Sequence, residues 1–288
     1  MSFKRLVTLM VVCMMLLVLV TAVATAQQAQ PAPAKAGTVT FNTVFTKLKA
    51  GQQVFCESVS SPDTALVRKY CREKPQPDYI WIGMQHSRMD WETVQQMINI
   101  CASEKVPPFV RVPQTYTPDD IQRAADAGAL GIIVPMVETI QQAQNAVMYF
   151  RNPIMDVKNP SVQPWSKRSQ GGNRLWGPDY NSNWNNNCFI MLQLESAAGV
   201  GMIEYILQYV PSINGVMIAS SDFGYQVGDR DGDPSYNARE EIVRKAVLAH
   251  GVTLIGPSSW YGRPGYTMYQ GMMPAQKGGT GAAPQENR

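Results

Sequence analysis

Seven short apolar runs recur along the middle of the chain, separated by segments with helical periodicity. The runs lie at 52–60, 78–85, 108–114, 130–137, 188–196, 215–222 and 252–259. The segments between them predict helices at 62–72, 91–104, 118–127, 139–150, 199–209 and 237–249. Because the predicted strands are continuously apolar and alternate with helices, the pattern indicates a parallel sheet covered on both faces.

The number and spacing of these units favour an α/β fold of the TIM (β/α)8 type over residues 42–270. A doubly wound open sheet is the alternative fold. It is less favoured because no glycine-rich phosphate-binding turn follows the first predicted strand.

The predicted barrel is incomplete at its C-terminal end. Only the residues from Trp260 to Gly265 separate the seventh strand from the apolar segment 266–270. A parallel crossover ordinarily needs about a dozen residues or more, so 266–270 is not expected to pair with the seventh strand as a regular eighth strand. We expect a partner subunit in a homo-oligomer, or a helix at 42–50, to cover the resulting gap.

A long segment at 151–188 interrupts the strand–helix alternation and reads as an insert. It is rich in Asn and Pro and carries Trp165, Trp176 and Trp184. We interpret these indoles as anchors on the barrel or at a subunit contact, in preference to a surface that stacks sugars. An interaction module built on this insert is a further alternative.

Both ends of the chain lie outside the predicted barrel. Residues 1–26 have the layout of a signal peptide, with Lys4 and Arg5, an apolar run and a small-residue cleavage site. A retained membrane anchor is the alternative for this segment. The composition of 27–41 indicates a flexible linker, and that of 271–288 a disordered tail. We therefore expect an exported protein, periplasmic or secreted, with no membrane attachment after cleavage.

Charge and cysteine content exclude two classes of function. Removal of Lys4 and Arg5 from 25 basic residues leaves 23 against 22 acidic ones, without a charge run, so nucleic-acid binding is not expected. Cys56, Cys71, Cys101 and Cys188 have no zinc-site spacing. Disulfides and buried thiols both remain open for these four residues.

An acidic segment, 229–240, has aspartates at intervals that resemble a calcium-binding loop. Pro234 stands where such a loop needs glycine for its sharp turn. We interpret the segment as an acidic loop that leads into a helix.

Polar residues sit near the ends of several apolar runs. His86 follows the second run, Arg111 lies in the third, Gln193 and Glu195 end the fifth, and Asp222 ends the sixth. Because barrel active sites form at the carboxyl ends of the strands, these side chains are expected to share one mouth. Each also has a structural interpretation, such as a helix cap, a buried backbone partner or an Arg111–Glu195 ion pair.

The order of the motifs "IGMQHS", "VRVP", "GALGIIVPMV", "LQLES" and "ASSDFG" is distinctive. From about Asn42 to Gly256 the chain resembles the HpcH/HpaI aldolases, the metal-dependent class II pyruvate aldolases related to citrate lyase beta subunits. This resemblance implies a carbon–carbon lyase that acts on a small 2-oxo acid and an aldehyde through an enolate.

The resemblance also implies a metal centre and a substrate site. Glu195 and Asp222 match the family's metal ligands, and two carboxylates with waters suit Mg²⁺ or Mn²⁺. Arg111 matches the residue that stabilises the developing enolate, and Gln193 matches a residue that contacts the same ligand.

Two further roles follow from the same resemblance. His86 matches the histidine implicated in proton transfer, and backbone amides around Ser221 and Asp222 match those that receive the substrate carboxylate. The chain departs from the family at Gly83 and Gln85, where the family has acids before the histidine. These departures support an alternative function, an exported relative that binds a small carboxylate at the same metal site without the family reaction.

Overall fold

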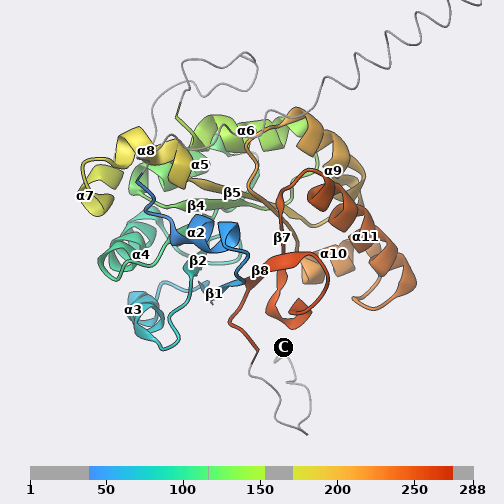
Figure 1. Cartoon of the computed structure of the whole chain (residues 1–288), viewed down its shortest axis with the longest axis horizontal. Helices are drawn as coiled ribbons and strands as arrows, with labels where there is room; N and C mark the ends of the chain where they lie inside the picture. Colours follow the sequence, from blue (N-terminus) through green and yellow to red (C-terminus); the bar gives the residue numbers. More distant parts are fainter. Residues whose placement is uncertain (1–38, 116, 153–170, 275–288) are drawn as a thin grey trace, which may run out of the picture. The chain divides into compact units, whose positions relative to one another are not determined.

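Eight parallel strands form the centre of the molecule and close into a barrel in chain order. The structure is a computed structural model and describes residues 39–115, 117–152 and 171–274. The strands are β1 (Val54–Val59), β2 (Tyr79–Gly83), β3 (Pro108–Arg111), β4 (Gly131–Val134), β5 (Phe189–Leu194), β6 (Gly215–Ile218), β7 (Thr253–Pro257) and β8 (Tyr266–Gln270). The pairing of β8 with β1 closes the ring, as Figure 1 shows. The predicted TIM-type barrel is confirmed, and the open-sheet alternative is wrong.

Helices surround this barrel at its sides and at its two ends. They are α2 (Thr43–Lys49), α3 (Thr64–Arg72), α4 (Trp91–Ser103), α5 (Pro118–Ala127), α6 (Ile140–Phe150), α7 (Gly172–Trp176), α8 (Tyr180–Asn187), α9 (Ala197–Tyr209), α10 (Ser220–Val227) and α11 (Pro234–Ala249). Several start at residues that favour helix N-termini. The side chains of Asp63, Asp90, Thr139 and Ser196 each accept a hydrogen bond from an amide of the first turn.

Two separate apolar cores stabilise the fold. One fills the barrel interior and the other lies between the strands and the helices. On β5, Phe189 and Met191 belong to the interior core, whereas Ile190 and Leu192 belong to the outer one. Because side chains alternate along a strand, this register also decides which polar residues face the barrel axis.

The predicted gap at the C-terminal end is wrong. Residues 266–270 form a parallel strand that pairs with β7 on one side and with β1 on the other. A single 3-10 turn, η2 (Ser258–Trp260), replaces the crossover helix, and Gly262 and Gly265 adopt positive φ of 88°. Extended chain advances about 3.3 Å per residue, so this short connection suffices to return along one short strand.

A polar network holds the short β7–β8 connection against the acidic loop that precedes α11. Trp260 Nε1 donates to Asp231 Oδ2 at 2.8 Å, and Arg263 pairs with the same carboxylate at 2.7 Å. Tyr266 Oη donates to Glu240 Oε1 at 2.6 Å. Asp231 therefore binds the neighbouring connection, and α11 begins at Pro234, as expected for an acidic loop leading into a helix.

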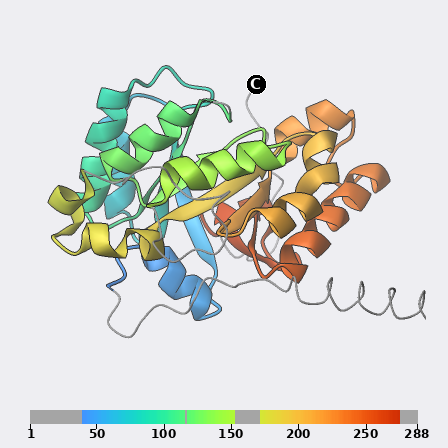
Figure 2. The same ribbon diagram turned by 90° about the horizontal axis from the view of Figure 1, so that it is seen from above.

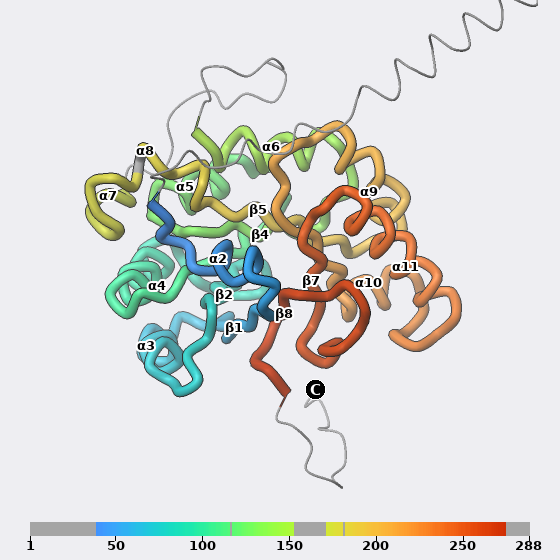
Figure 3. The backbone as a smooth tube through the Cα atoms, in the orientation of Figure 1, coloured from blue at the N-terminus to red at the C-terminus, as the bar shows by residue number. Residues whose placement is uncertain are grey.

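Helix α2 lies across the N-terminal end of the barrel, not beside β8 (Figures 1 and 3). Asn42 Nδ2 donates to the carbonyls of Leu130 and Asn187, which precede β4 and β5, at 3.1 and 2.9 Å. Val44 belongs to the interior core. The helix expected at 42–50 therefore closes the bottom of the barrel and does not cover a lateral gap.

The described part of the 151–188 segment is helical and fastened to the barrel. Trp184 is fully buried, and its indole donates to the carbonyl of Phe150 at 2.7 Å. The Trp176 indole donates to the carbonyl of Gly128 at 2.9 Å. These two contacts agree with the interpretation of the indoles as anchors. Trp165 lies outside the described residues.

The predicted signal peptide, most of the linker and most of the tail lie outside the described residues. Val39 and Phe41, assigned to the linker by composition, donate their backbone amides to Asn183 and Asn187. The barrel's contacts therefore extend at least to Val39. Within the described ranges no helix is long and apolar enough to cross a membrane.

Candidate active site

Strand alternation brings three polar side chains to the carboxyl end of the barrel. Arg111 lies two residues beyond Phe109 of the interior core, and Gln193 lies two beyond Met191. Glu195 follows at the same spacing, just past the end of β5. All three are buried. The residues expected at the mouth from β3 and β5 therefore do lie there.

Glu195 is a carboxylate held in a dry environment. Its side chain is 4% exposed, and Oε2 accepts a hydrogen bond from Gln85 Nε2 at 3.4 Å. Burial, and to a lesser extent the negative charge of Asp222, raise the pKa of Glu195 to about 7. Gln85, Arg111 and the backbone of Met136 favour the ionised form, but they do not offset the burial.

The charges of the same two carboxylates act on Arg111. Its guanidinium carbon lies 5.5 Å from the centre of the Trp81 ring, a distance typical of a cation–π contact. Burial lowers the pKa of Arg111, and the charges of Glu195 and Asp222 oppose this shift. Arg111, Glu195 and Asp222 are thus electrostatically coupled, although no direct ion pair joins Arg111 to either acid among the described contacts.

Asp222 and Ser221 lie in the first turn of α10, directly after β6. Ala219 is the N-cap and supplies no side-chain hydrogen bond. Amides of a first helical turn have no carbonyl partner within the helix, and the helix dipole adds positive potential there. Asp222 is half-buried and Ser221 is exposed. This end of the helix therefore presents amide donors beside an acid at the barrel mouth.

Several buried polar atoms around this mouth lack a hydrogen-bond partner in the described structure. They are Oε1 of Gln85, Gln193 and Glu195 and Nε of Arg111. A buried unsatisfied polar atom ordinarily costs about 1–3 kcal/mol. Such a group of unsatisfied donors and acceptors is typical of a site completed by a bound molecule or ion.

Glu195 and Asp222 fit a hard divalent cation. The described residues contain no cluster of three or more His, Cys, Asp or Glu side chains arranged to bind a metal. Mg²⁺ is commonly held by one or two carboxylates and keeps several waters, so two acids meet its needs. The unsatisfied Oε1 of Glu195 provides a free ligand atom for such an ion.

His86 is in the loop after β2 and is exposed. No hydrogen bond or ion pair joins it to another described residue. The structure therefore shows no hydrogen bond or ion pair between His86 and the three buried residues. Its predicted role in proton transfer remains a prediction.

The positions that differ from the family pattern have distinct surroundings. A Cβ on Gly83 would lie 2.7 Å from Ser60 Oγ and 3.6 Å from Arg111 Nη2, so Ser60 occupies space beside the arginine. Gln85 contacts Glu195 directly. The sequence pattern does not identify Ser60 as a site residue, because no periodicity or charge distinguishes it from an ordinary loop residue. It marks Gln85 only as a departure from the family's acid and does not predict its contact with Glu195.

Met136, two residues after the end of β4, is another residue that the sequence pattern missed. Its φ is 52°, in the left-handed region, and its side chain is 45% exposed. This conformation ordinarily costs a non-glycine residue about 1–3 kcal/mol. Strain of this kind next to Glu195 is consistent with a functional constraint on the backbone amide that faces the carboxylate.

Substitution of Met136 tests this strain. Met136→Gly is expected to raise the free energy of unfolding by about 1 kcal/mol, and Met136→Val to lower it by a similar amount. Chemical denaturation monitored by Trp fluorescence measures both changes. Met273→Gly is the control, because Met273 is equally exposed but has no positive φ. Equal effects of glycine at both positions would contradict backbone strain as the cause.

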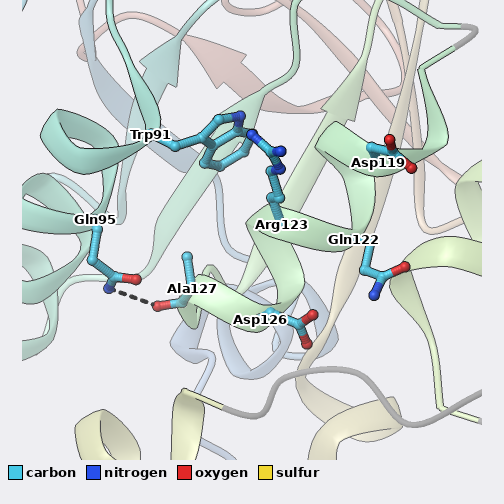
Figure 4. A pocket seen from close by; sticks show the side chains of 7 residues that line it. All are labelled: Trp91, Gln95, Asp119, Gln122, Arg123, Asp126 and Ala127. Carbon is cyan, nitrogen blue, oxygen red and sulfur yellow. Dashed lines mark hydrogen bonds between the residues drawn. The ribbon is translucent and has the colours of Figure 1, made fainter.

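A cleft of about 420 Å³ lies apart from these residues, between α4 and α5. Figure 4 shows its lining, which includes Trp91, Arg123 and Asp126, and the hydrogen bond from Gln95 to the carbonyl of Ala127. None of the predicted site residues lines this cleft. The helical layer that contains it is visible from a second direction in Figure 2.

The chain has recognisable relatives. Residues 59–256 match the family model described as HpcH/HpaI aldolase/citrate lyase. The chain is 32% identical over 153 residues to a 5-keto-4-deoxy-D-glucarate aldolase of Klebsiella pneumoniae, covering 52% of this chain and 56% of that protein. It is 28% identical over 171 residues to a 4-hydroxy-2-oxo-heptane-1,7-dioate aldolase of Salmonella dublin, covering 59% of this chain and 62% of that protein. The chain thus spans somewhat more than half the length of these relatives.

Solved structures share the fold. An HpcH/HpaI aldolase/citrate lyase family protein from Burkholderia cenocepacia superposes with a TM-score of 0.68 at 23% identity, covering 80% of this chain and 92% of that one. An HpcH/HpaI aldolase from Desulfitobacterium hafniense superposes with a TM-score of 0.65 at 22% identity, covering 79% of this chain and 88% of that one. At this level of identity the likeness concerns the fold alone.

Proposed function

Because the chain belongs to the HpcH/HpaI aldolase/citrate lyase family, we propose that it is a metal-dependent carbon–carbon lyase. In the cleavage direction its substrate is a 2-oxo acid that yields pyruvate or a similar small 2-oxo acid together with an aldehyde. In the reverse direction these two compounds are the substrates. The names of the two relatives, both aldolases, support this reaction class.

Glu195 and Asp222 hold the divalent ion, Mg²⁺ or Mn²⁺, in this proposal. They contribute two negative charges that already act on each other in the ion's absence. A bound cation would offset that repulsion. When bound, the ion supplies Lewis-acid polarisation of the 2-oxo group.

Arg111 and Gln193 orient the 2-oxo acid. The Arg111 guanidinium stabilises negative charge as it develops on the enolate oxygen, and its burial strengthens that interaction. Gln193 Oε1, buried and without a partner, is available to the same ligand. The first-turn amides around Ser221 and Asp222 receive the substrate carboxylate.

Cleavage also requires two proton transfers. A base removes the proton of the distal hydroxyl, the carbon–carbon bond breaks to release the aldehyde, and the enolate then takes up a proton to give the 2-oxo acid. His86 is the proposed group, because a histidine imidazole can both accept and donate a proton. Its exposure means that substrate must bring the reacting hydroxyl within its reach.

The observation that carries this proposal is the burial of Arg111, Gln193 and Glu195 together at the carboxyl end of the barrel. The test is exchange of the methyl protons of pyruvate in D₂O, followed by NMR, with Mg²⁺ or Mn²⁺ and with a chelator. Metal-dependent exchange that Glu195→Gln abolishes supports the enzyme. If the folded protein binds the metal but does not catalyse exchange of the pyruvate protons, the proposed lyase activity is wrong.

A second function is favoured by the polar residues at positions where the family has acids. Gln85 and Gly83 leave His86 without an acidic neighbour from that segment. In this alternative, an exported relative binds a small carboxylate at the same metal site without cleaving it. In that case calorimetry should show metal-dependent binding of pyruvate, and NMR should show no exchange of its methyl protons.

Metal affinity is expected to depend on pH through Glu195. The pKa of this carboxyl is raised to about 7, so below that pH the proton competes with the cation. Affinity should fall about tenfold per pH unit below 7 and level off above it. Calorimetric titration with Mn²⁺ between pH 5.5 and 8 measures the change. In Glu195→Gln the residual affinity should lose this dependence, and a flat profile in the wild type would contradict the assignment.

Export to the periplasm or the medium, and assembly into a homo-oligomer, complete the proposed function. The N-terminal layout of Lys4, Arg5 and the following apolar run supports export. Intact mass measurement of the exported protein tests cleavage after Ala26, and light scattering tests assembly.

A further inference from the structure

Two cysteines on adjacent outer helices lie in contact. Cys71 is in the last turn of α3 and Cys101 is near the end of α4. Their sulfur atoms are 3.9 Å apart, and both side chains are fully buried. The two helices run side by side in Figures 1 and 3.

Polar contacts fix the ends of these helices relative to each other. Arg72, next to Cys71, pairs with Glu104 of the α4 C-cap at 2.7 Å. Gln76 Nε2 donates to the Cys71 carbonyl at 2.7 Å and to the Glu104 carbonyl at 3.4 Å. The backbone around the two thiols is therefore held in place on both sides, and a disulfide requires the sulfur atoms to approach from 3.9 Å to about 2.05 Å.

We propose that Cys71 and Cys101 form a disulfide in the exported protein. This proposal depends on export, because an oxidising compartment favours such bonds. It does not depend on the lyase activity. The bond cross-links α3 to α4 on the outside of the barrel.

The chemistry is thiol–disulfide exchange with a protein or small-molecule disulfide. One thiolate attacks the oxidant's disulfide and displaces a thiolate. The second cysteine then attacks the mixed disulfide, releasing the oxidant's other thiolate. Two protons and two electrons leave the cysteine pair, and the oxidant becomes a dithiol. Because both thiols are buried in the folded chain, the bond forms while the chain folds.

The other two described cysteines have different neighbours. Cys56 lies in the barrel interior, where its sulfur contacts Ser58 and accepts from the amide of Gly271. The charge of Arg151 acts on the thiol of Cys188, at the base of β5. Neither contact involves a second sulfur atom. The structure therefore assigns one specific pair out of the possible pairings.

The test uses the full chain, exported by its own leader into an oxidising compartment. The purified protein is unfolded without reductant, alkylated and digested with trypsin. Cleavage at the flanking Lys and Arg places Cys71 in the peptide 70–72 and Cys101 in the peptide 89–105. The expected result is these two peptides linked to each other, with Cys56 and Cys188 alkylated. Alkylation of all four, or any other linkage, would overturn the proposal.

Variants give a second, independent measurement. Cys71→Ser and Cys101→Ser should each lower the unfolding midpoint by about 5–10 °C without reductant, in line with the loop that the bond closes. With dithiothreitol that difference should largely disappear, because the wild type then loses the bond too. Cys188→Ser is the matched control, and its effect should be the same with and without reductant. If Cys71→Ser lowers the unfolding midpoint by the same amount with and without reductant, the proposed disulfide is wrong.

Discussion

Arg111→Met is expected to slow metal-dependent proton exchange of pyruvate by about 10²–10³-fold without weakening the metal site. The guanidinium is buried at the barrel mouth, and the charges of Glu195 and Asp222 both act on it. Its removal takes away stabilisation of the enolate charge. The same removal takes away a positive charge that repels a cation, so metal affinity should stay equal or rise.

Methionine is chosen because it keeps much of the volume of the arginine stem against Trp81. Exchange is measured by NMR in D₂O, and metal affinity by calorimetry with Mn²⁺. Glu195→Gln is the paired variant, and it should lose both exchange and metal affinity, the latter by at least about 10–100-fold. The contrast between the two variants separates a charge-stabilising role from metal binding. If Arg111→Met weakens metal binding as much as Glu195→Gln does, the proposed division of roles is wrong.

The largest effect on stability is expected from Arg151→Ala. This arginine is buried, and its guanidinium donates to the carbonyls of Asn185, Cys188 and Ser212 and to Asn214 Oδ1. These residues lie before β5 and β6, at the opposite end of the barrel from Glu195. Alanine would leave several acceptors unsatisfied, so the free energy of unfolding should fall by about 3 kcal/mol.

Denaturant unfolding measures this loss. Arg230→Ala is the control, since Arg230 is exposed, and its effect should stay within about 0.5 kcal/mol. Arg151→Lys should recover only part of the stability, because one ammonium cannot reproduce the planar fork that reaches several carbonyls. A loss below about 1 kcal/mol for Arg151→Ala would show that water replaces the guanidinium.

Local patterns in the sequence predicted most of the barrel. The apolar runs became strands because a strand that is buried on both sides needs apolar residues at every position. The same register placed Arg111 and Gln193 on the barrel axis, two residues beyond Phe109 and Met191 of the interior core. Glu195 and Asp222 were identified from motif order, and the structure brings their charges within reach of each other.

The sequence by itself thus determined the strand–helix order, the family and the carboxyl-end position of the polar residues, because these depend on local periodicity and short motifs. Only the tertiary structure decided that β8 closes the barrel, that α2 covers its base and that Gln85 contacts Glu195. It also decided that Cys71 meets Cys101 and that Arg151 holds the base of β5. Each of these features depends on contacts between residues that are far apart in the chain. No local pattern encodes such contacts, because a glutamine, cysteine or arginine in the same local sequence could equally well lie in an exposed loop.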